Sequence, residues 1–226
     1  MRAFENRSDC VVWDEPFYGP YLHLTGKTHP GAAEVIADQG YNWREVVRRI
    51  EGSIPESASL WYQKHMTHHM LDDISLDFMD TLANCFLIRD PVEVLSSYRQ
   101  RRESFDASDL GFKRQFELFE YVRSRSGEVP PVLDSADVLK DPRGMLNALC
   151  AHLGIEFSPA MLNWPAGARD SDGVWSKYWY DAVKRSTGFM PYKPHTIDLD
   201  EDARLITDAG RDYYDMLYAH RLMPLH

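Results

Sequence analysis

The chain has 226 residues, of which 44% are hydrophobic and 27% are charged, a composition typical of one globular domain. Its formal net charge of −10 argues against a general nucleic-acid binder, because such proteins neutralise phosphates with surplus Lys and Arg. No apolar run approaches the roughly eighteen residues of a membrane span, and residues 1–7 do not resemble a signal peptide.

The cysteines favour a reducing environment. Cys10, Cys85 and Cys150 are odd in number, widely spaced and set in apolar segments. This pattern predicts reduced, buried thiols rather than a disulfide framework or a zinc site. We therefore expect a cytoplasmic protein.

Strand-like and helix-like segments alternate along the chain. Short apolar runs that end in polar residues predict strands, and apolar residues at a spacing of about 3.6 predict helices. The helix that follows Asp141 is the best marked, with a capping Asp, a Pro at its first position and Gly154 as its stop. The expected elements, in chain order, are a strand at 11–13, a helix at 43–50, a strand at 60–65, a helix at 70–78, a strand at 85–88, a helix at 112–119, a strand at 129–133, and helices at 142–153, 175–183 and 205–217.

This alternation indicates an α/β fold. Strands that are continuous apolar runs separated by helices predict a three-layer sandwich with a mainly parallel central sheet. Ligands of such sheets bind beyond the carboxyl ends of the strands. The polar residues that end each predicted strand are therefore the candidate site residues.

The segment 86–99 carries the strongest functional signal. Its apolar strand delivers Arg89 to the sheet edge, and Asp90 and Pro91 then mark the start of a helix. An Arg at this position can grip a phosphate with its planar guanidinium. The alternative is a surface Arg paired with Asp90 or Glu93.

The spacing of this segment resembles the 3′-phosphate-binding motif of sulfotransferases, enzymes with a P-loop NTPase-like fold. Arg89 and Ser97 fall on the two ligand positions of that motif. The resemblance implies that they bind 3′-phosphoadenosine 5′-phosphosulfate (PAPS), the sulfuryl donor of the family.

Other segments extend the resemblance along the chain. Residues 12–18 are similar to the Asp-Glu-Pro-Phe segment of bacterial sulfotransferase-like proteins, and residues 132–155 to a later block of the family. Gly173-Val174-Trp175, with Arg169 upstream, resembles the late Gly-x-Trp motif over the nucleotide. The aromatic and cationic segment 175–189 adds Lys184 and Arg185 as secondary nucleotide-binding candidates, although such a stripe more often serves packing.

One family feature does not occur in the sequence. Sulfotransferases open with a strand and a phosphate-binding loop, whereas residues 1–7 resemble the end of the helix that follows this loop. We therefore expect residues 1–226 to form a single sulfotransferase-like domain that is N-terminally incomplete and lacks the first strand. Three explanations stay open: a fragment, a protein that has lost catalysis, or a loop supplied by another polypeptide.

Two segments offer a catalytic base. Glu15 ends the first strand, where some bacterial sulfotransferases place a catalytic Glu, and burial would raise its pKa. Lys64 and His65 end the second strand and resemble the Lys-Thr-His segment of cytosolic sulfotransferases, which implies Lys64 as the cation and His65 or His68 as the base. Glu15 could instead cap a turn, and the histidines could be exposed or could bind a metal, although no fourth ligand is evident.

The resemblance implies sulfuryl transfer from PAPS to the hydroxyl or amine of a small molecule. The absent loop leaves a non-catalytic or truncated nucleotide-binding protein as the alternative. A P-loop kinase fits less well, because the chain has no Gly-x-x-x-x-Gly-Lys-Ser/Thr motif. The sequence indicates neither the acceptor, the oligomeric state nor a metal.

Overall fold

Two pairs of short parallel strands organise the part of the chain that the computed structural model describes, residues 1–55, 58–99, 107–194 and 200–226. Each pair belongs to one of two compact units. Unit 1 comprises residues 1–81 and 158–190, and unit 2 comprises residues 82–157 and 191–226.

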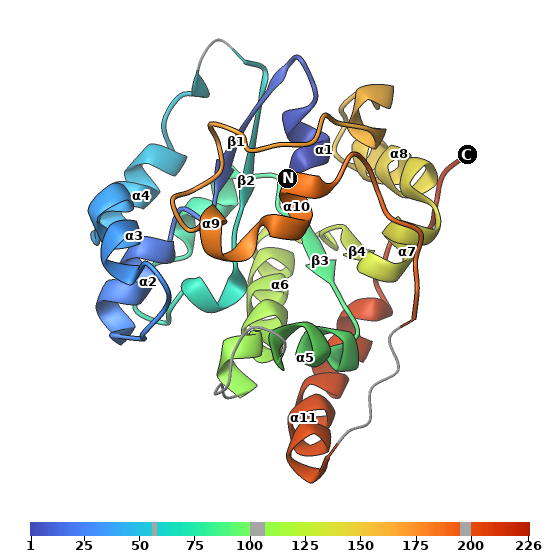
Figure 1. The fold of residues 1–226 in the computed structure, drawn as a ribbon. Helices are drawn as coiled ribbons and strands as arrows, with labels where there is room; N and C mark the ends of the chain where they lie inside the picture. The colour runs from blue at the N-terminus through green and yellow to red at the C-terminus, as the bar shows by residue number, and fades with distance from the viewer. Residues whose placement is uncertain (56–57, 100–106, 195–199) are drawn as a thin grey trace. The chain divides into compact units, whose positions relative to one another are not determined.

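The strand pair of unit 1 joins β1 (Cys10–Asp14) to β2 (Leu60–Lys64) (Figure 1). The two strands run parallel, and their register sets Asp14 opposite Lys64. Both strands therefore end at the same edge, and the polar residues that follow each run are brought together there. This edge carries the candidate site.

Short helices surround this strand pair. Figure 1 shows α2, α3 and α4 gathered on one side of it. Val35 of α3 is fully buried with Tyr18, Tyr21 and Trp175 in one apolar cluster. The helices of unit 1 are α1 (Arg2–Glu5), α2 (Tyr18–Thr25), α3 (Ala32–Gln39), α4 (Trp43–Ile50), α9 (Ser176–Trp179) and α10 (Asp181–Arg185), with 3₁₀ turns at Thr67–His69, Asp77–Thr81 and Pro159–Leu162.

Unit 2 contains the second pair, β3 (Phe86–Ile88) and β4 (Val132–Asp134), which is also parallel. Its helices are α5 (Pro91–Arg99), α6 (Phe112–Ser126), α7 (Ser135–Lys140), α8 (Pro142–His152) and α11 (Glu201–Tyr218), with a 3₁₀ turn at Ala107–Leu110. Helix α11 packs against α5 and α6.

The α/β class and the parallel pairing are confirmed, as are the strands expected near residues 11, 60, 86 and 132. The helix starts are also confirmed where a cap was recognised. The Asp90 side chain accepts from the backbone N–H of Val92 at 2.8 Å, and the Asp141 side chain accepts from that of Gly144 at 3.0 Å.

Two expected helices are wrong. The segment 70–78 contains no α-helix: its backbone forms short turns, in which Ile74 N–H donates to Leu71 O at 3.0 Å, and the Ser75 hydroxyl accepts from the N–H of Asp77 and donates to its carboxylate. The expected helix at 175–183 is interrupted at Tyr180, which separates α9 from α10.

The sequence also misjudged burial at β3. Leu87, in the middle of this strand, is 63% exposed, and Cys85 just before it is exposed, whereas Cys10 and Cys150 are buried. The run was expected to be buried on both faces, but the strand shields only Phe86 and Ile88 on one face.

Candidate active site

A lysine and two carboxylates meet at the carboxyl edge of β1 and β2. The parallel register places Lys64 beside Asp14, and the chain continues directly from Asp14 to Glu15. The Lys64 ammonium donates to Asp14 Oδ1 at 3.2 Å and also to Glu15 Oε1. The predicted pair Glu15 and Lys64 is thus brought into contact, with Asp14 as a third member.

The backbone of Glu15 is strained. Its φ is +45°, which makes it the one non-glycine residue with positive φ in the described part of the chain. Three hydrogen bonds hold this conformation: Glu15 N–H donates to Lys64 O at 2.8 Å, while Glu15 O accepts from Tyr18 N–H at 3.0 Å and from Gln39 Nε2 at 3.1 Å. Strain of this kind persists where surrounding contacts over-determine it, commonly at functional sites.

Tyr180 completes the cluster from a distant part of the sequence. Its hydroxyl donates to Asp14 Oδ2 at 2.5 Å and accepts from the Lys64 ammonium at 3.0 Å. The interruption between α9 and α10 sets Tyr180 at this position. Lys64 therefore has Asp14, Glu15 and Tyr180 as partners for its three N–H donors.

Burial and the neighbouring charges shift the pKa values of the groups in this cluster. Burial raises the pKa of Glu15, and the nearby Lys64 offsets only part of that effect. Burial opposes the charge of Lys64, but Glu15 and Asp14 outweigh it and raise the pKa of the ammonium well above its ordinary value. Burial also raises the pKa of Tyr180. Lys64 therefore stays charged, and Tyr180 stays a neutral phenol.

The histidines beside this cluster are neutral. Burial, followed by the charge of Lys64, lowers the pKa of His65 to about 4, and burial lowers that of His69 well below its ordinary value. His65 bonds Gln63 Oε1 through Nε2 at 3.2 Å, and its ring packs on Phe17. Its Nδ1 is buried and has no hydrogen-bond partner among the described residues.

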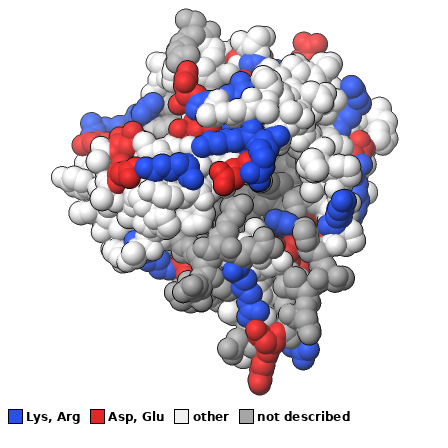
Figure 2. Space-filling model, viewed as in Figure 1, with Lys and Arg blue, Asp and Glu red and all other residues white. Residues whose placement is uncertain are grey.

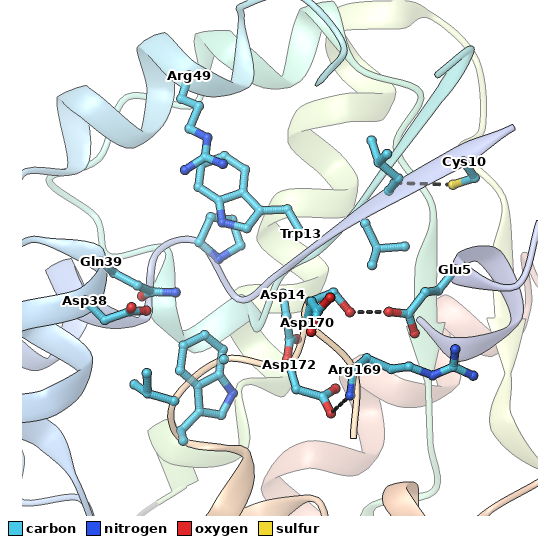
Figure 3. A pocket seen from close by; sticks show the side chains of 17 residues that line it. Glu5, Cys10, Trp13, Asp14, Asp38, Gln39, Arg49, Arg169, Asp170 and Asp172 are labelled. Atoms are coloured by element: carbon cyan, nitrogen blue, oxygen red, sulfur yellow. Dashed lines mark hydrogen bonds between the residues drawn. The ribbon is translucent and has the colours of Figure 1, made fainter. Parts of the chain in front are cut away.

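A pocket of about 910 Å³ in unit 1 opens onto Asp14. Figure 3 shows Arg49 beside Trp13 on one side of it and Glu5 with Arg169 on the other. The Arg49 guanidinium lies 4.2 Å from the Trp13 ring centroid. The pocket is lined by Glu5, residues 10–14, Pro16, Asp38, Gln39, Arg49 and residues 169–175.

The predicted Gly-x-Trp segment lies along this pocket. Gly173 is required by packing, since a Cβ at this position would overlap the ring of Trp175. Trp175 is 2% exposed and packs edge-on against Tyr18 at 5.4 Å. Arg169 lines the pocket, and its Nη2 donates to Pro165 O at 3.2 Å.

The two secondary candidates of α10 are placed differently. Lys184 is half-buried, Arg185 is exposed, and neither lines this pocket. Lys184 contributes through its backbone, which donates to Tyr180 O at 2.7 Å and accepts from Gly167 N–H at 2.7 Å. These contacts fix the segment that carries Tyr180.

Arg89 and Ser97 both lie in unit 2. Arg89 follows β3, and its Nε donates to Glu93 Oε2 at 3.0 Å. The ion pair with Glu93, one of the alternatives expected from the sequence, is therefore present. No described residue accepts a hydrogen bond from its terminal nitrogens, and its side chain is 37% exposed. Ser97 is partly buried on α5. Arg89 therefore retains two nitrogens that can bind an anion.

Three residues at this site were not identified from the sequence: Asp14 and Tyr180 of the cluster, and Gln39, which bonds Glu15 O. Asp14 carried a signal, since it stands next to Glu15 at a strand end. Tyr180 and Gln39 carried none, because each reaches the site only through tertiary packing.

Neither a metal centre nor a membrane span is found in the described ranges. His65, His68 and His69 do not form part of any group of three or more His, Cys, Asp or Glu that could hold an ion there. None of the described helices combines the length and apolarity needed to cross a bilayer. Basic and acidic side chains are intermixed on the face shown in Figure 2.

Two solved structures resemble the chain. The sulfotransferase domain from the curacin biosynthetic pathway is 13% identical, with a TM-score of 0.39, over 85% of this chain and 77% of that one. The sulfotransferase domain from the Synechococcus PCC 7002 olefin synthase is 16% identical, with a TM-score of 0.45, over 92% and 76%.

Two Arabidopsis thaliana proteins are similar in sequence over most of this chain. Branched-chain-amino-acid aminotransferase-like protein 1 is 33% identical over 100% of the chain, and the like-named protein 2 is 30% identical over 88%. The chain spans only 38% and 35% of their lengths, so their names describe much longer proteins. The family model described as a sulfotransferase domain matches residues 1–220, which include nearly all of both units, and the chain therefore belongs to the sulfotransferase domain family.

Proposed function

We propose that the chain transfers a sulfuryl group from PAPS to the hydroxyl or amine of a small molecule. The observation that carries this proposal is the contact between Glu15 and Lys64 at the carboxyl edge of β1 and β2. Sulfuryl transfer, like phosphoryl transfer, needs a cation for the leaving oxygen and a base for the acceptor proton. This contact supplies one group for each task.

Glu15 fits the role of the base. Burial raises the pKa of Glu15 in the direction of neutral pH, and a general base works best when its pKa is near the operating pH. As the acceptor oxygen or nitrogen bonds to sulfur, its proton passes to Glu15, and the bond from sulfur to the bridging oxygen breaks. His65 fits less well, because a pKa of about 4 makes its imidazole a weak base.

Lys64 fits the role of the cation. The bridging oxygen takes the electron pair of the broken bond and leaves with the bisphosphate. A permanently charged ammonium stabilises the developing negative charge, and the raised pKa of Lys64 excludes it as a base. Arg169, which lines the adjoining pocket, would contribute positive potential only, and the same holds for Lys184 and Arg185, which do not line it.

Arg89 and Ser97 fit the 3′-phosphate of the donor. Glu93 binds Nε of Arg89 and fixes the plane of the guanidinium, while the two terminal nitrogens form the fork that binds phosphate oxygens in pairs. Ser97 would add a hydroxyl donor from α5. Both residues of this proposed half-site belong to unit 2.

Calorimetry tests the donor half-site. Adenosine 3′,5′-bisphosphate is titrated into the chain, with AMP as the control ligand. We expect preference for the bisphosphate, and loss of that preference in Arg89→Ala. Arg123→Ala, which removes a half-exposed arginine of α6 in the same unit, is the matched control and should bind as the wild type does. Absence of binding by the folded chain would leave a non-catalytic member of the family as the better description.

Kinetics test the catalytic assignment. Release of the bisphosphate from PAPS is followed with 2-naphthol and tyramine as hydroxyl and amine acceptors. Glu15→Gln should lower kcat by about 10²–10⁴-fold, the usual contribution of a general base. His65→Gln should retain activity within about tenfold of the wild type, and the reverse order would exchange the roles of the two residues.

A further inference from the structure

We infer that Tyr180 and Asp14 are positioning residues that hold Lys64, which leaves Glu15 as the partner that exchanges a proton. This inference rests on the proposed function of the Lys64 and Glu15 pair. It assigns different tasks to two adjacent carboxylates that contact the same ammonium.

Lys64, Asp14 and Tyr180 form a closed triangle of hydrogen bonds. Lys64 donates to Asp14 Oδ1 at 3.2 Å and to the Tyr180 hydroxyl at 3.0 Å, and that hydroxyl donates to Asp14 Oδ2 at 2.5 Å. Each oxygen of the Asp14 carboxylate therefore has its own donor. Three mutually bonded groups restrict one another's rotamers, so the ammonium is fixed from two directions.

Burial of the charged side chains differs across the cluster. The side chain of Asp14 is 1% exposed, that of Glu15 is 11% exposed and that of Lys64 is 29% exposed. Asp14 is therefore the deeper of the two carboxylates and Glu15 the more accessible, while Tyr180 is as buried as Glu15. A buried carboxylate with both oxygens bonded is a stable counter-ion, and the more accessible one can meet an incoming acceptor.

The charge balance of the cluster changes during transfer. When Glu15 takes a proton it loses its attraction for Lys64. Without another anchor the ammonium would lose its counter-ion at the moment when it must face the leaving oxygen. Asp14 and Tyr180 keep the ammonium charged and in place. The raised pKa of Tyr180 keeps the phenol protonated, so Tyr180 cannot take the acceptor's proton in place of Glu15.

The geometry of α9 and α10 supports the same assignment. Tyr180 lies between these two short helices, where a continuous helix was expected from the sequence. Its backbone is held on the α10 side by Lys184 N–H, which donates to Tyr180 O at 2.7 Å. From this break between the helices, the Tyr180 hydroxyl reaches both Lys64 and Asp14.

The variant Tyr180→Phe removes the hydroxyl and keeps the ring. Tyr178→Phe is the matched control, because Tyr178 lies on α9, is 41% exposed and makes no hydrogen bond to Lys64. The first measurement is the rate at which 2,4,6-trinitrobenzenesulfonate modifies Lys64, read from the modified peptide by mass spectrometry. Only the uncharged amine reacts, so loss of an anchor should raise this rate several-fold in Tyr180→Phe and leave it unchanged in Tyr178→Phe.

The second measurement is bisphosphate release from PAPS with 2-naphthol. Tyr180→Phe should lower kcat by about tenfold or more while KM for PAPS changes less than about twofold, since a misplaced catalytic group affects the transition state most. Asp14→Asn should show the same two effects. A general loss of fold would instead change KM and kcat together and would appear in the circular dichroism spectrum.

The two measurements separate this inference from the proposed function. Unchanged labelling of Lys64 in Tyr180→Phe overturns the inference whether or not the wild type is active. Faster labelling with unchanged kcat also overturns it, because Tyr180 would then hold Lys64 without affecting the rate of sulfuryl transfer. If the wild type releases no bisphosphate, the proposed function fails, and the labelling rate alone decides whether Tyr180 and Asp14 hold Lys64.

Discussion

The pH dependence of stability is a direct test of the environment of His65. Burial and the charge of Lys64 lower its pKa from 6.5 to about 4 in the folded chain. Below pH 6.5 the unfolded chain therefore binds a proton that the folded chain does not. The contribution of His65 to stability is complete above this pH and is lost as the pH falls toward about 4.

The size of this effect follows from the two pKa values. Between about pH 7.5 and about pH 5, a group that titrates at 6.5 when unfolded and at about 4 when folded loses about 2 kcal/mol of stability. His69 acts in the same direction, because its pKa is also lowered by burial. Glu15 acts in the opposite direction, since its raised pKa favours the folded chain as the pH falls.

The assay compares His65→Gln with the wild type by urea denaturation at both pH values. The variant cannot titrate at this position, so its loss of stability between the two pH values should be smaller by about 2 kcal/mol. His152→Gln on α8, where the side chain is exposed, controls for a general histidine effect. Equal losses in His65→Gln and the wild type would refute the neutral, buried assignment and would restore His65 as a candidate base.

Three further substitutions test the fold that supports the site. Gly173→Ala should cost about 1–3 kcal/mol and should shift the fluorescence of Trp175, because the added methyl overlaps that ring; an unchanged spectrum would contradict the packing. Asp141→Ala should lower stability in urea by about 1 kcal/mol through loss of a helix cap, and a neutral result would argue against that cap. Leu118→Ala at a fully buried position should cost about 2–5 kcal/mol in the same assay, against little change for Leu205→Ala, which is 66% exposed.

Local patterns in the sequence were sufficient for the elements around the two candidate sites. Apolar runs predicted the strands that end at Asp14, Lys64 and Ile88. The caps of α5 and α8 were predicted because they depend on residues within one turn of the helix start. These signals are local, so the sequence determines them without knowledge of the rest of the chain.

Periodicity failed where tertiary contacts competed with helix propensity. The expected helix at 70–78 is replaced by short backbone turns, in one of which the Ser75 side chain bonds Asp77, and the one at 175–183 is interrupted at Tyr180, which bonds Asp14. Propensity differences amount to only about 0.7 kcal/mol per residue for ordinary residues, so a few side-chain contacts outweigh them.

The sequence by itself determined the α/β class, the family resemblance, and the identities of Glu15, Lys64, Arg89 and Ser97 as candidates. Only the tertiary structure decided that Asp14 and Tyr180 share the ammonium of Lys64, and that burial keeps His65 neutral. The reason is physical: Tyr180 lies 166 positions from Asp14, and the pKa of a group depends on the burial and charges that only the folded chain brings around it.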